Sequence, residues 1–179
     1  MKIIVPLAEG FEEIEAVTII DTLRRAGVDT VTASLNKQVV TGAHGIPVTA
    51  DSVLGSDENF SGIVLPGGMP GSTNLKNDQR IISLIQKIYN KGGVAAALCA
   101  APIVLAEAGI LNGKKYTCYP GFEDEIGKNN YLSEPVITDG NIITGKGPAC
   151  ALPFALKITE ILKGKEVAEG LKKQMTAFW

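Results

Sequence analysis

The chain has 179 residues, of which 45% are hydrophobic and 20% charged, and its formal net charge is -2. A chain of this size can bury a full hydrophobic core without disulfides or metal ions, so we expect one domain over residues 1–179. The charge balance and the lack of a long basic run argue against a nucleic-acid or membrane-surface partner, and no apolar stretch is long enough to predict a membrane-spanning helix.

Short apolar runs alternate along the chain with longer segments of helical periodicity. This pattern is typical of a mostly parallel sheet with helices on both faces. In the first half we predict strands at 2–6, 28–34 and 63–65, a small hairpin within 39–48, a loop at 66–71, and helices at 12–26 and 78–89. The buried face of the first helix is marked by Ala16, Ile19, Ile20 and Leu23, and Gly27 predicts its C-terminal end.

The second half continues this alternation. Residues 92–98 form an apolar strand that runs into a helix ending at Gly109, and residues 116–119 are a candidate short strand. Asp139-Gly140 predicts a hairpin within 135–143. Helices are predicted at 147–162 and 165–175.

The strand-to-helix junction at Cys99 is the strongest candidate for chemistry. A nucleophile at such an elbow has a strained backbone and needs small neighbours, and Ala97 and Ala101 lie two residues to either side. Pro102 suits the first turn of a helix, and the positive end of a helix favours a thiolate. The alternative is that Cys99 is a small buried side chain in an alanine-rich core.

The three cysteines, Cys99, Cys118 and Cys150, include no C-x-x-C pair. They indicate free thiols in a reducing compartment and predict neither a disulfide framework nor a zinc site. The first apolar run is too short for a signal peptide. We therefore expect a cytoplasmic protein with no metal centre.

An acidic cluster, Glu12, Glu13 and Glu15, opens the first predicted helix. Because the carboxyl ends of parallel strands meet at one edge of a sheet, this cluster is expected near Cys99. Helical geometry puts Glu15 at the edge of the buried face and Glu13 at the opposite edge, with Glu12 pointing away. A carboxyl in an apolar crevice would have a raised pKa and could carry protons, whereas the alternative is that the cluster only complements the helix dipole.

The glycine loop that includes Gly67 and Gly68 also allows two interpretations. It is either an ordinary turn or a source of backbone N–H groups that form an oxyanion hole with the N–H of Ala100. The only histidine, His44, is predicted to lie in a surface turn. A cysteine hydrolase needs a histidine base beside its nucleophile, so peptidase activity is not expected.

Together these residues resemble the ThiJ/PfpI superfamily, and within it the branch of the human parkinsonism-associated protein and its bacterial relatives. The resemblance covers nearly the whole chain and rests on residues 8–15, 21, 24–27, 65–68, 97–102, 147–148 and 164–168. It implies a flavodoxin-like three-layer sandwich without a cofactor. It also implies that Cys99 is the reactive, oxidisable cysteine, that Glu15 hydrogen-bonds to it, and that the N–H groups of Gly68 and Ala100 face the thiol.

The resemblance further implies an enzyme of glyoxalase or deglycase type that acts on a small aldehyde or glycated substrate. The alternative is an oxidative-stress sensor or redox-regulated chaperone that uses oxidation of Cys99. A homodimer is expected through the first helix, whose outer face presents Glu12, Asp21 and Arg25. Tyr119 lies where relatives carry a histidine and is a possible proton relay.

Two further departures from the family pattern concern the pocket and the subunit interface. Ala100 replaces a glycine that is common after the cysteine, which keeps the N–H donor but narrows the pocket. His44 falls near a position that is an arginine in the dimer interface of the human protein.

Overall fold

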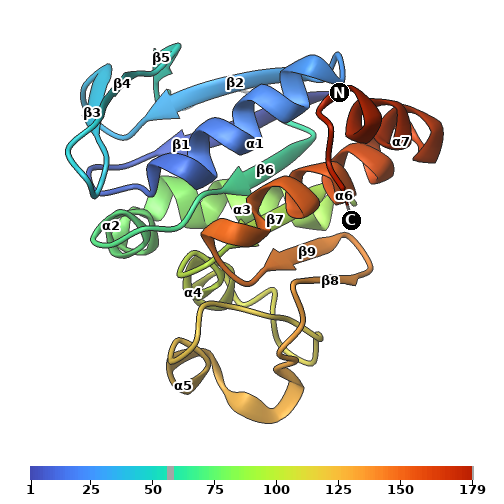
Figure 1. Cartoon of the computed structure of the whole chain (residues 1–179). Helices are drawn as coiled ribbons and strands as arrows, with labels where there is room; N and C mark the ends of the chain where they lie inside the picture. Colours follow the sequence, from blue (N-terminus) through green and yellow to red (C-terminus); the bar gives the residue numbers. More distant parts are fainter. Residues whose placement is uncertain (56–58, 179) are drawn as a thin grey trace.

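The computed structural model describes residues 1–55 and 59–178, and its main feature is a twisted central sheet (Figure 1). The strands run in the order β5-β2-β1-β6-β7-β9-β8, and all neighbours are parallel except β8 and β9. A separate antiparallel pair, β3 and β4, makes a small hairpin beside this sheet. The strand bounds are β1 Lys2–Leu7, β2 Asp29–Ser34, β3 Val39–Thr41, β4 Pro47–Thr49, β5 Ser52–Val53, β6 Gly62–Leu65, β7 Val94–Leu98, β8 Val136–Asp139 and β9 Ile142–Gly145.

Helices cover both faces of the sheet and bury two separate cores. One face packs against α1 (Glu13–Arg25) and α6 (Ala151–Lys163), and α7 (Lys165–Gln174) packs on α6. The other packs against α2 (Gly71–Asn77), α3 (Gln79–Asn90) and α4 (Pro102–Glu107). Alternation along β1 serves both cores, since Ile3 and Val5 point to the first face and Ile4 to the second.

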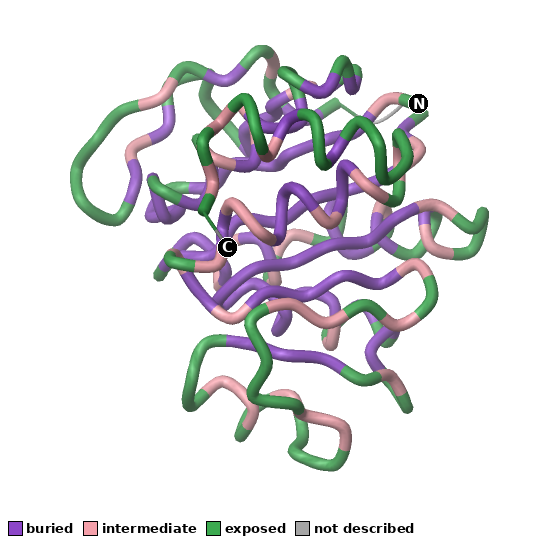
Figure 2. Tube along the Cα trace, turned by 45° about the vertical axis from the view of Figure 1, so that its right-hand side comes forward, coloured by how far each residue is buried: buried purple, intermediate pink, exposed green. Residues whose placement is uncertain are grey.

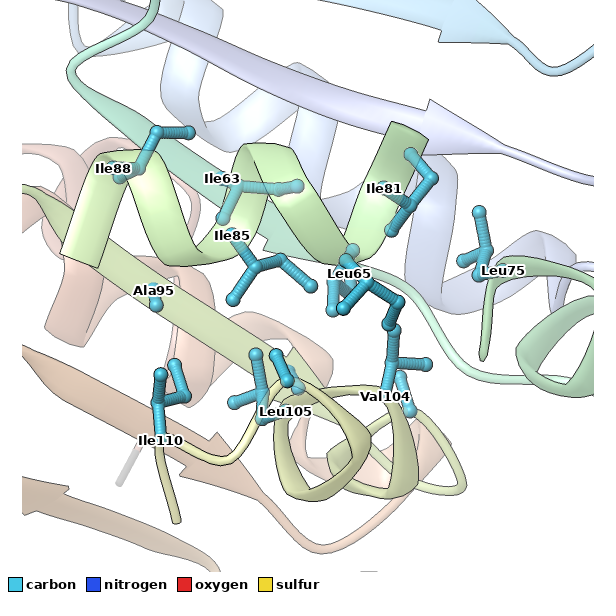
Figure 3. Close-up of a cluster of buried hydrophobic side chains, with 14 of the residues drawn as sticks. Ile63, Leu65, Leu75, Ile81, Ile85, Ile88, Ala95, Val104, Leu105 and Ile110 are labelled. Atoms are coloured by element: carbon cyan, nitrogen blue, oxygen red, sulfur yellow. The ribbon is translucent and has the colours of Figure 1, made fainter. Parts of the chain in front are cut away.

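In the core under α3, the apolar residues that recur along the helix pack against the sheet. Ile81, Ile85 and Ile88 recur along one side of the helix and lie over Ile63 and Ala95 of the sheet (Figure 3). Figure 2 shows that buried residues follow the strands and the inner sides of the helices, whereas the connecting turns are exposed. This arrangement confirms the predicted α/β sandwich with a mostly parallel sheet.

The topology decides where a site can form. From β1 the chain first crosses to β2 on one side and later places β6 on the other side of β1. Such a reversal opens a crevice at the carboxyl ends of the strands, where ligands bind in open α/β sheets. The β1–α1 loop, the β6–α2 loop and the β7–α4 junction all lie at this edge.

Most predicted elements are present, but the prediction of a strand at 116–119 is wrong. Tyr116 forms only an isolated bridge with Tyr131, because the neighbouring Thr117 N–H donates to the Thr144 side chain at 2.9 Å instead of to a strand. The predicted helix over 147–162 starts with a 3-10 turn, Pro148–Cys150.

Two short helices were not predicted from the sequence, α2 and α5 (Glu123–Ile126). The sequence of α2, GSTNLKN, contains weak helix formers and has a single large buried side chain, Leu75. No apolar periodicity could therefore indicate it. Every helix in the described ranges is too short or too polar to traverse a bilayer, and the cytoplasmic location stays a prediction.

Candidate functional site

Cys99 lies at the sharp turn between β7 and α4, and its backbone is strained as predicted. Its φ is 63°, in the left-handed region that side chains other than glycine rarely adopt. Two backbone hydrogen bonds hold this conformation: the Cys99 N–H donates to the Gly145 carbonyl at 2.9 Å, and its own carbonyl accepts from the Tyr119 N–H at 2.8 Å. The end of β9 and the backbone at Tyr119 therefore fix the backbone conformation that directs the thiol.

Glu15 reaches the same point from the first turn of α1. Its side chain is fully buried, at 0% exposure, and Oε2 accepts a 2.7 Å hydrogen bond from the Gly67 N–H. Oε1 is buried, and no donor among the described residues lies in hydrogen-bonding geometry to it. The carboxyl and the Cys99 thiol lie close enough for each to change the pKa of the other. Of the acidic cluster, Glu15 therefore lies beside Cys99, as the sequence analysis predicted.

Glycines bring the three loops into contact. A Cβ added at Gly67 would lie 2.7 Å from Cys99 Cβ and 2.8 Å from Glu15 Oε2. Gly68 has a φ of 92°, and a Cβ there would lie 2.3 Å from the backbone nitrogen of Glu12. Only glycine permits this approach at both positions, which explains the Gly-Gly run in the sequence.

The electrostatics of the pair are set by burial. Burial raises the pKa of the Glu15 carboxyl to about 7, against the lowering effects of the Gly67 N–H and the Cys99 thiol. Burial also raises the pKa of the Cys99 thiol, as do the charge and hydrogen bond of Glu15. Two anions in contact are unfavourable in a buried site, so we expect the pair to keep one proton near neutral pH.

This result corrects the expectation that a helix N-terminus alone lowers the thiol pKa. Helix α4 begins only at Pro102 and has six residues, so its dipole is short and does not outweigh burial and Glu15. The backbone N–H groups of Ala100 and Gly68 do face the sulfur and act in the opposite direction, favouring the thiolate.

The other two acidic residues of the cluster differ from the sequence interpretation. Glu12 was expected to point away but is buried as the N-cap of α1, where its Oε2 accepts from the Glu15 N–H at 2.7 Å. The Glu13 carboxylate binds the β3–β4 turn, accepting from the His44 N–H at 2.7 Å and contacting His44 Nδ1 at 2.9 Å. His44 is in a surface turn, as predicted, and the hydrogen bond to Glu13 raises its pKa.

Tyr119 lies near the elbow, but among the described residues its side chain makes no hydrogen bond to the Glu15 carboxyl. Its backbone N–H binds the Cys99 carbonyl, while its ring is exposed and packs edge-on against Phe122 at a centroid distance of 6.5 Å. No hydrogen bond of its hydroxyl occurs within residues 1–55 and 59–178. The relay role of Tyr119 stays a prediction.

The remaining thiols lie elsewhere. Cys118 is fully buried, and its Sγ contacts Glu123 Oε2 at 3.9 Å. Burial and the Glu123 charge raise the pKa of Cys118 to about 12. Cys150 is half-buried at the N-cap of α6.

Sequence reasoning missed the Gly145 carbonyl and the Glu13–His44 contact, because both depend on segments far apart in the chain. Gly145 closes the elbow from the end of β9, and His44 reaches Glu13 from the small hairpin. No local sequence pattern connects these partners.

An α/β sandwich with a cysteine at the strand-to-helix elbow and a buried carboxyl beside it defines the class of this protein. The chain belongs to the DJ-1/PfpI family, whose sequence model matches residues 1–161. It is 40% identical over 172 residues to DJ-1 homolog B of Arabidopsis thaliana and spans only 39% of the length of that protein. It is also 40% identical to protein dj-1beta of Drosophila melanogaster, covering 94% of this chain and 95% of the relative.

The structure of oxidized Toxoplasma gondii DJ-1 superposes with a TM-score of 0.95 at 37% identity, covering 99% of both chains. Two relatives carry names that state an activity. A glutathione-independent glyoxalase of Caenorhabditis elegans is 35% identical, with 93% of this chain and 91% of that protein covered. A deglycase of Pyrococcus horikoshii is 29% identical, with 91% and 100% covered.

Proposed function

We propose that the protein is a cofactor-free, cysteine-dependent enzyme that acts on small reactive carbonyls, of glyoxalase or deglycase type. The observation that carries the proposal is the contact between the Cys99 thiol and the Glu15 carboxyl, whose Oε1 has no further hydrogen-bond partner among the described residues. Relatives named as a glyoxalase and a deglycase support the same reaction class.

The first step joins the substrate to the enzyme. In the reactive form of the pair, Glu15 holds the shared proton and the Cys99 sulfur bears the charge. The sulfur attacks the aldehyde carbon of methylglyoxal, a carbon–sulfur bond forms, and the carbonyl electron pair moves to oxygen. The N–H groups of Gly68 and Ala100 stabilise the alkoxide, which then takes the proton from Glu15.

The second step is an internal redox transfer that needs no external oxidant. The Glu15 carboxylate removes the proton from the carbon bonded to sulfur, which gives an enediolate, and the hydroxyl proton on that carbon moves to the neighbouring oxygen. The same carboxyl returns a proton to the neighbouring carbon, so that one carbon is oxidised and the other reduced. The resulting thioester reacts with water to release lactate and restore the thiol.

Lactate formation from methylglyoxal tests this proposal. Wild type should form lactate, whereas Cys99→Ser should not, because a serine hydroxyl is a much weaker acid and nucleophile than a thiol. Glu15→Gln should also fail, because the amide cannot exchange the proton. Turnover by Cys99→Ser at the wild-type rate would contradict the proposal.

A second candidate function is redox sensing or redox-regulated chaperone activity through Cys99. The solved relative from Toxoplasma gondii is an oxidized form, which supports this candidate. Two equivalents of hydrogen peroxide would convert the thiolate to a sulfinate and release two waters. If peroxide oxidises Cys99 and the oxidised protein suppresses aggregation of a client while methylglyoxal is not consumed, the second candidate replaces the first.

We also propose that the protein forms a homodimer through α1. Ile14 and Val17 are exposed apolar side chains on this helix, beside the 2.6 Å ion pair of Asp21 and Arg25. A second copy of the helix would cover them. Light scattering at micromolar concentration should show a dimer that Val17→Glu weakens and Leu132→Glu, an exposed position elsewhere, does not. A wild-type monomer would contradict this proposal.

A further inference from the structure

The first turn of α1 buries more negative charge than its surroundings compensate. Glu12, Glu13 and Glu15 are 7%, 6% and 0% exposed. Throughout the described residues, none of these carboxyls forms an ion pair with lysine or arginine, and the one basic side chain beside them is His44. Buried carboxylates are normally paired with cations or coordinate metal ions. Among the described residues, His44 is therefore the one side chain beside the cluster that can carry a compensating positive charge.

Glu12, Glu13 and His44 place candidate ligand atoms for a metal ion close to one another. His44 Nδ1 lies 2.9 Å from Glu13 Oε2 and 4.0 Å from Glu12 Oε1, and the three candidate ligand atoms all lie within 4.8 Å of one another. Ligand atoms bound to one divalent metal at about 2.0–2.2 Å are roughly 3–3.5 Å apart. The Glu13 and His44 atoms are already about this close, whereas Glu12 Oε1, 4.0 Å from His44 Nδ1, would have to approach.

In Glu12 and Glu13, one carboxylate oxygen accepts backbone hydrogen bonds and the other does not. Glu12 Oε2 caps the helix through the Glu15 N–H, whereas Glu12 Oε1 has no hydrogen-bond partner within the described ranges although the side chain is more than nine-tenths buried. Glu13 Oε1 accepts from the N–H groups of His44 and Ile46. The remaining oxygen of each carboxylate is directed at the His44 ring.

We propose that Glu12, Glu13 and His44 bind a divalent transition metal ion of the Zn²⁺ class. A set of one imidazole nitrogen and two carboxylate oxygens suits such ions, whereas Mg²⁺ and Ca²⁺ prefer oxygen ligands alone. The His44 side chain is 71% exposed, which leaves an entry path and room for water as a further ligand. Binding releases the Nδ1 proton to solvent and joins the β3–β4 turn to the start of α1.

The test uses Zn²⁺ itself, in competition with a chromophoric chelator, and Co²⁺ as a spectroscopic probe. The variants are His44→Asn, Glu12→Gln, which keeps an oxygen for the helix cap, and two controls. Cys99→Ser removes the thiol that could bind metal at the other site, and Glu9→Gln neutralises a nearby acid outside the cluster. Circular dichroism checks that each variant is folded.

The proposal predicts one Zn²⁺ per chain, with affinity reduced at least about tenfold in His44→Asn and Glu12→Gln and unchanged in both controls. Bound Co²⁺ should show no sulfur-to-metal charge-transfer band in the near ultraviolet. Loss of binding in Cys99→Ser, a charge-transfer band, wild-type affinity in folded His44→Asn, or no stoichiometric binding by wild type would each overturn it. These readouts do not depend on turnover, so they remain informative whatever the enzymatic activity proves to be.

Discussion

Two thiol–carboxyl pairs occur in the described part of the chain, Cys99 with Glu15 and Cys118 with Glu123, and they differ in solvent access and in the groups that face the sulfur. Burial and a neighbouring carboxyl raise the thiol pKa in both pairs. Each carboxyl accepts a 2.7 Å hydrogen bond from a glycine N–H, Glu15 from Gly67 and Glu123 from Gly121, but Cys118 is 0% exposed. Cys99 is 8% exposed and faces two backbone N–H groups.

The difference shows that a thiol beside a carboxyl does not by itself make a site. Glu123 comes from the same local segment as Cys118, so this pair forms by chain proximity. Glu15 and Cys99 come from distant elements, and three loops must pack closely to bring them together. What distinguishes the elbow is the solvent access of Cys99 and the two backbone N–H groups that face its sulfur.

The largest expected effect comes from replacing the two carboxyls in turn. Glu15→Gln should lower lactate formation from methylglyoxal by at least about 100-fold, because proton transfer is lost. Alkylation of Cys99 by iodoacetamide should persist, since the Glu15 charge is one of the causes that raise the thiol pKa. Glu123→Gln is the matched control and should leave turnover within about twofold, an effect well below that of a proton-transfer residue. Equal loss in both variants would remove the distinction between the pairs.

The next effect concerns Gly67, which allows the loops around Cys99 and Glu15 to come into contact. Gly67→Ala should destabilise the protein by about 1–3 kcal/mol, because the added methyl overlaps Cys99 and Glu15. Gly170 in α7 has nothing within 4 Å of an added Cβ, so Gly170→Ala should stabilise the protein by up to about 1 kcal/mol. Chemical denaturation measures both changes. A Gly67→Ala variant as stable and active as wild type would show that the loops can separate without loss.

The thiols themselves give a smaller, kinetic contrast. Dilute iodoacetamide near neutral pH should label Cys99 before Cys118 and Cys150, because the N–H groups of Ala100 and Gly68 stabilise its thiolate. Cys118 should react last, since it has no access to solvent. Peptide mass spectrometry over time provides the order. Earlier labelling of Cys150 would indicate that exposure outweighs the elbow environment.

The smallest effect is expected at the rim of the site. Tyr119→Phe should change turnover by less than about tenfold, because the exposed hydroxyl makes no bond to Glu15 or Cys99 in the described structure while the backbone contact remains. Steady-state kinetics with methylglyoxal measures this directly. A loss as large as that of Glu15→Gln would establish the proton relay that the sequence comparison suggested.

Local patterns in the sequence were sufficient for the elements and for the elbow. Unbroken apolar runs predicted the buried strands, and the spacing of Ile81, Ile85 and Ile88 predicted α3, because side-chain periodicity reflects which face is buried. Small residues around Cys99 predicted the strained turn, since only they allow a strand and helix to approach so closely.

Only the tertiary structure decided which carboxyls are buried, which atoms they contact and how the thiol titrates. The sequence placed Glu12 in solvent, but the cap geometry and the packed glycine loops bury it and leave Oε1 directed at His44. It also favoured a lowered thiol pKa from the helix N-terminus, whereas burial and Glu15 raise it. Desolvation and through-space contacts sum over segments that are distant in the chain, so no local pattern contains them.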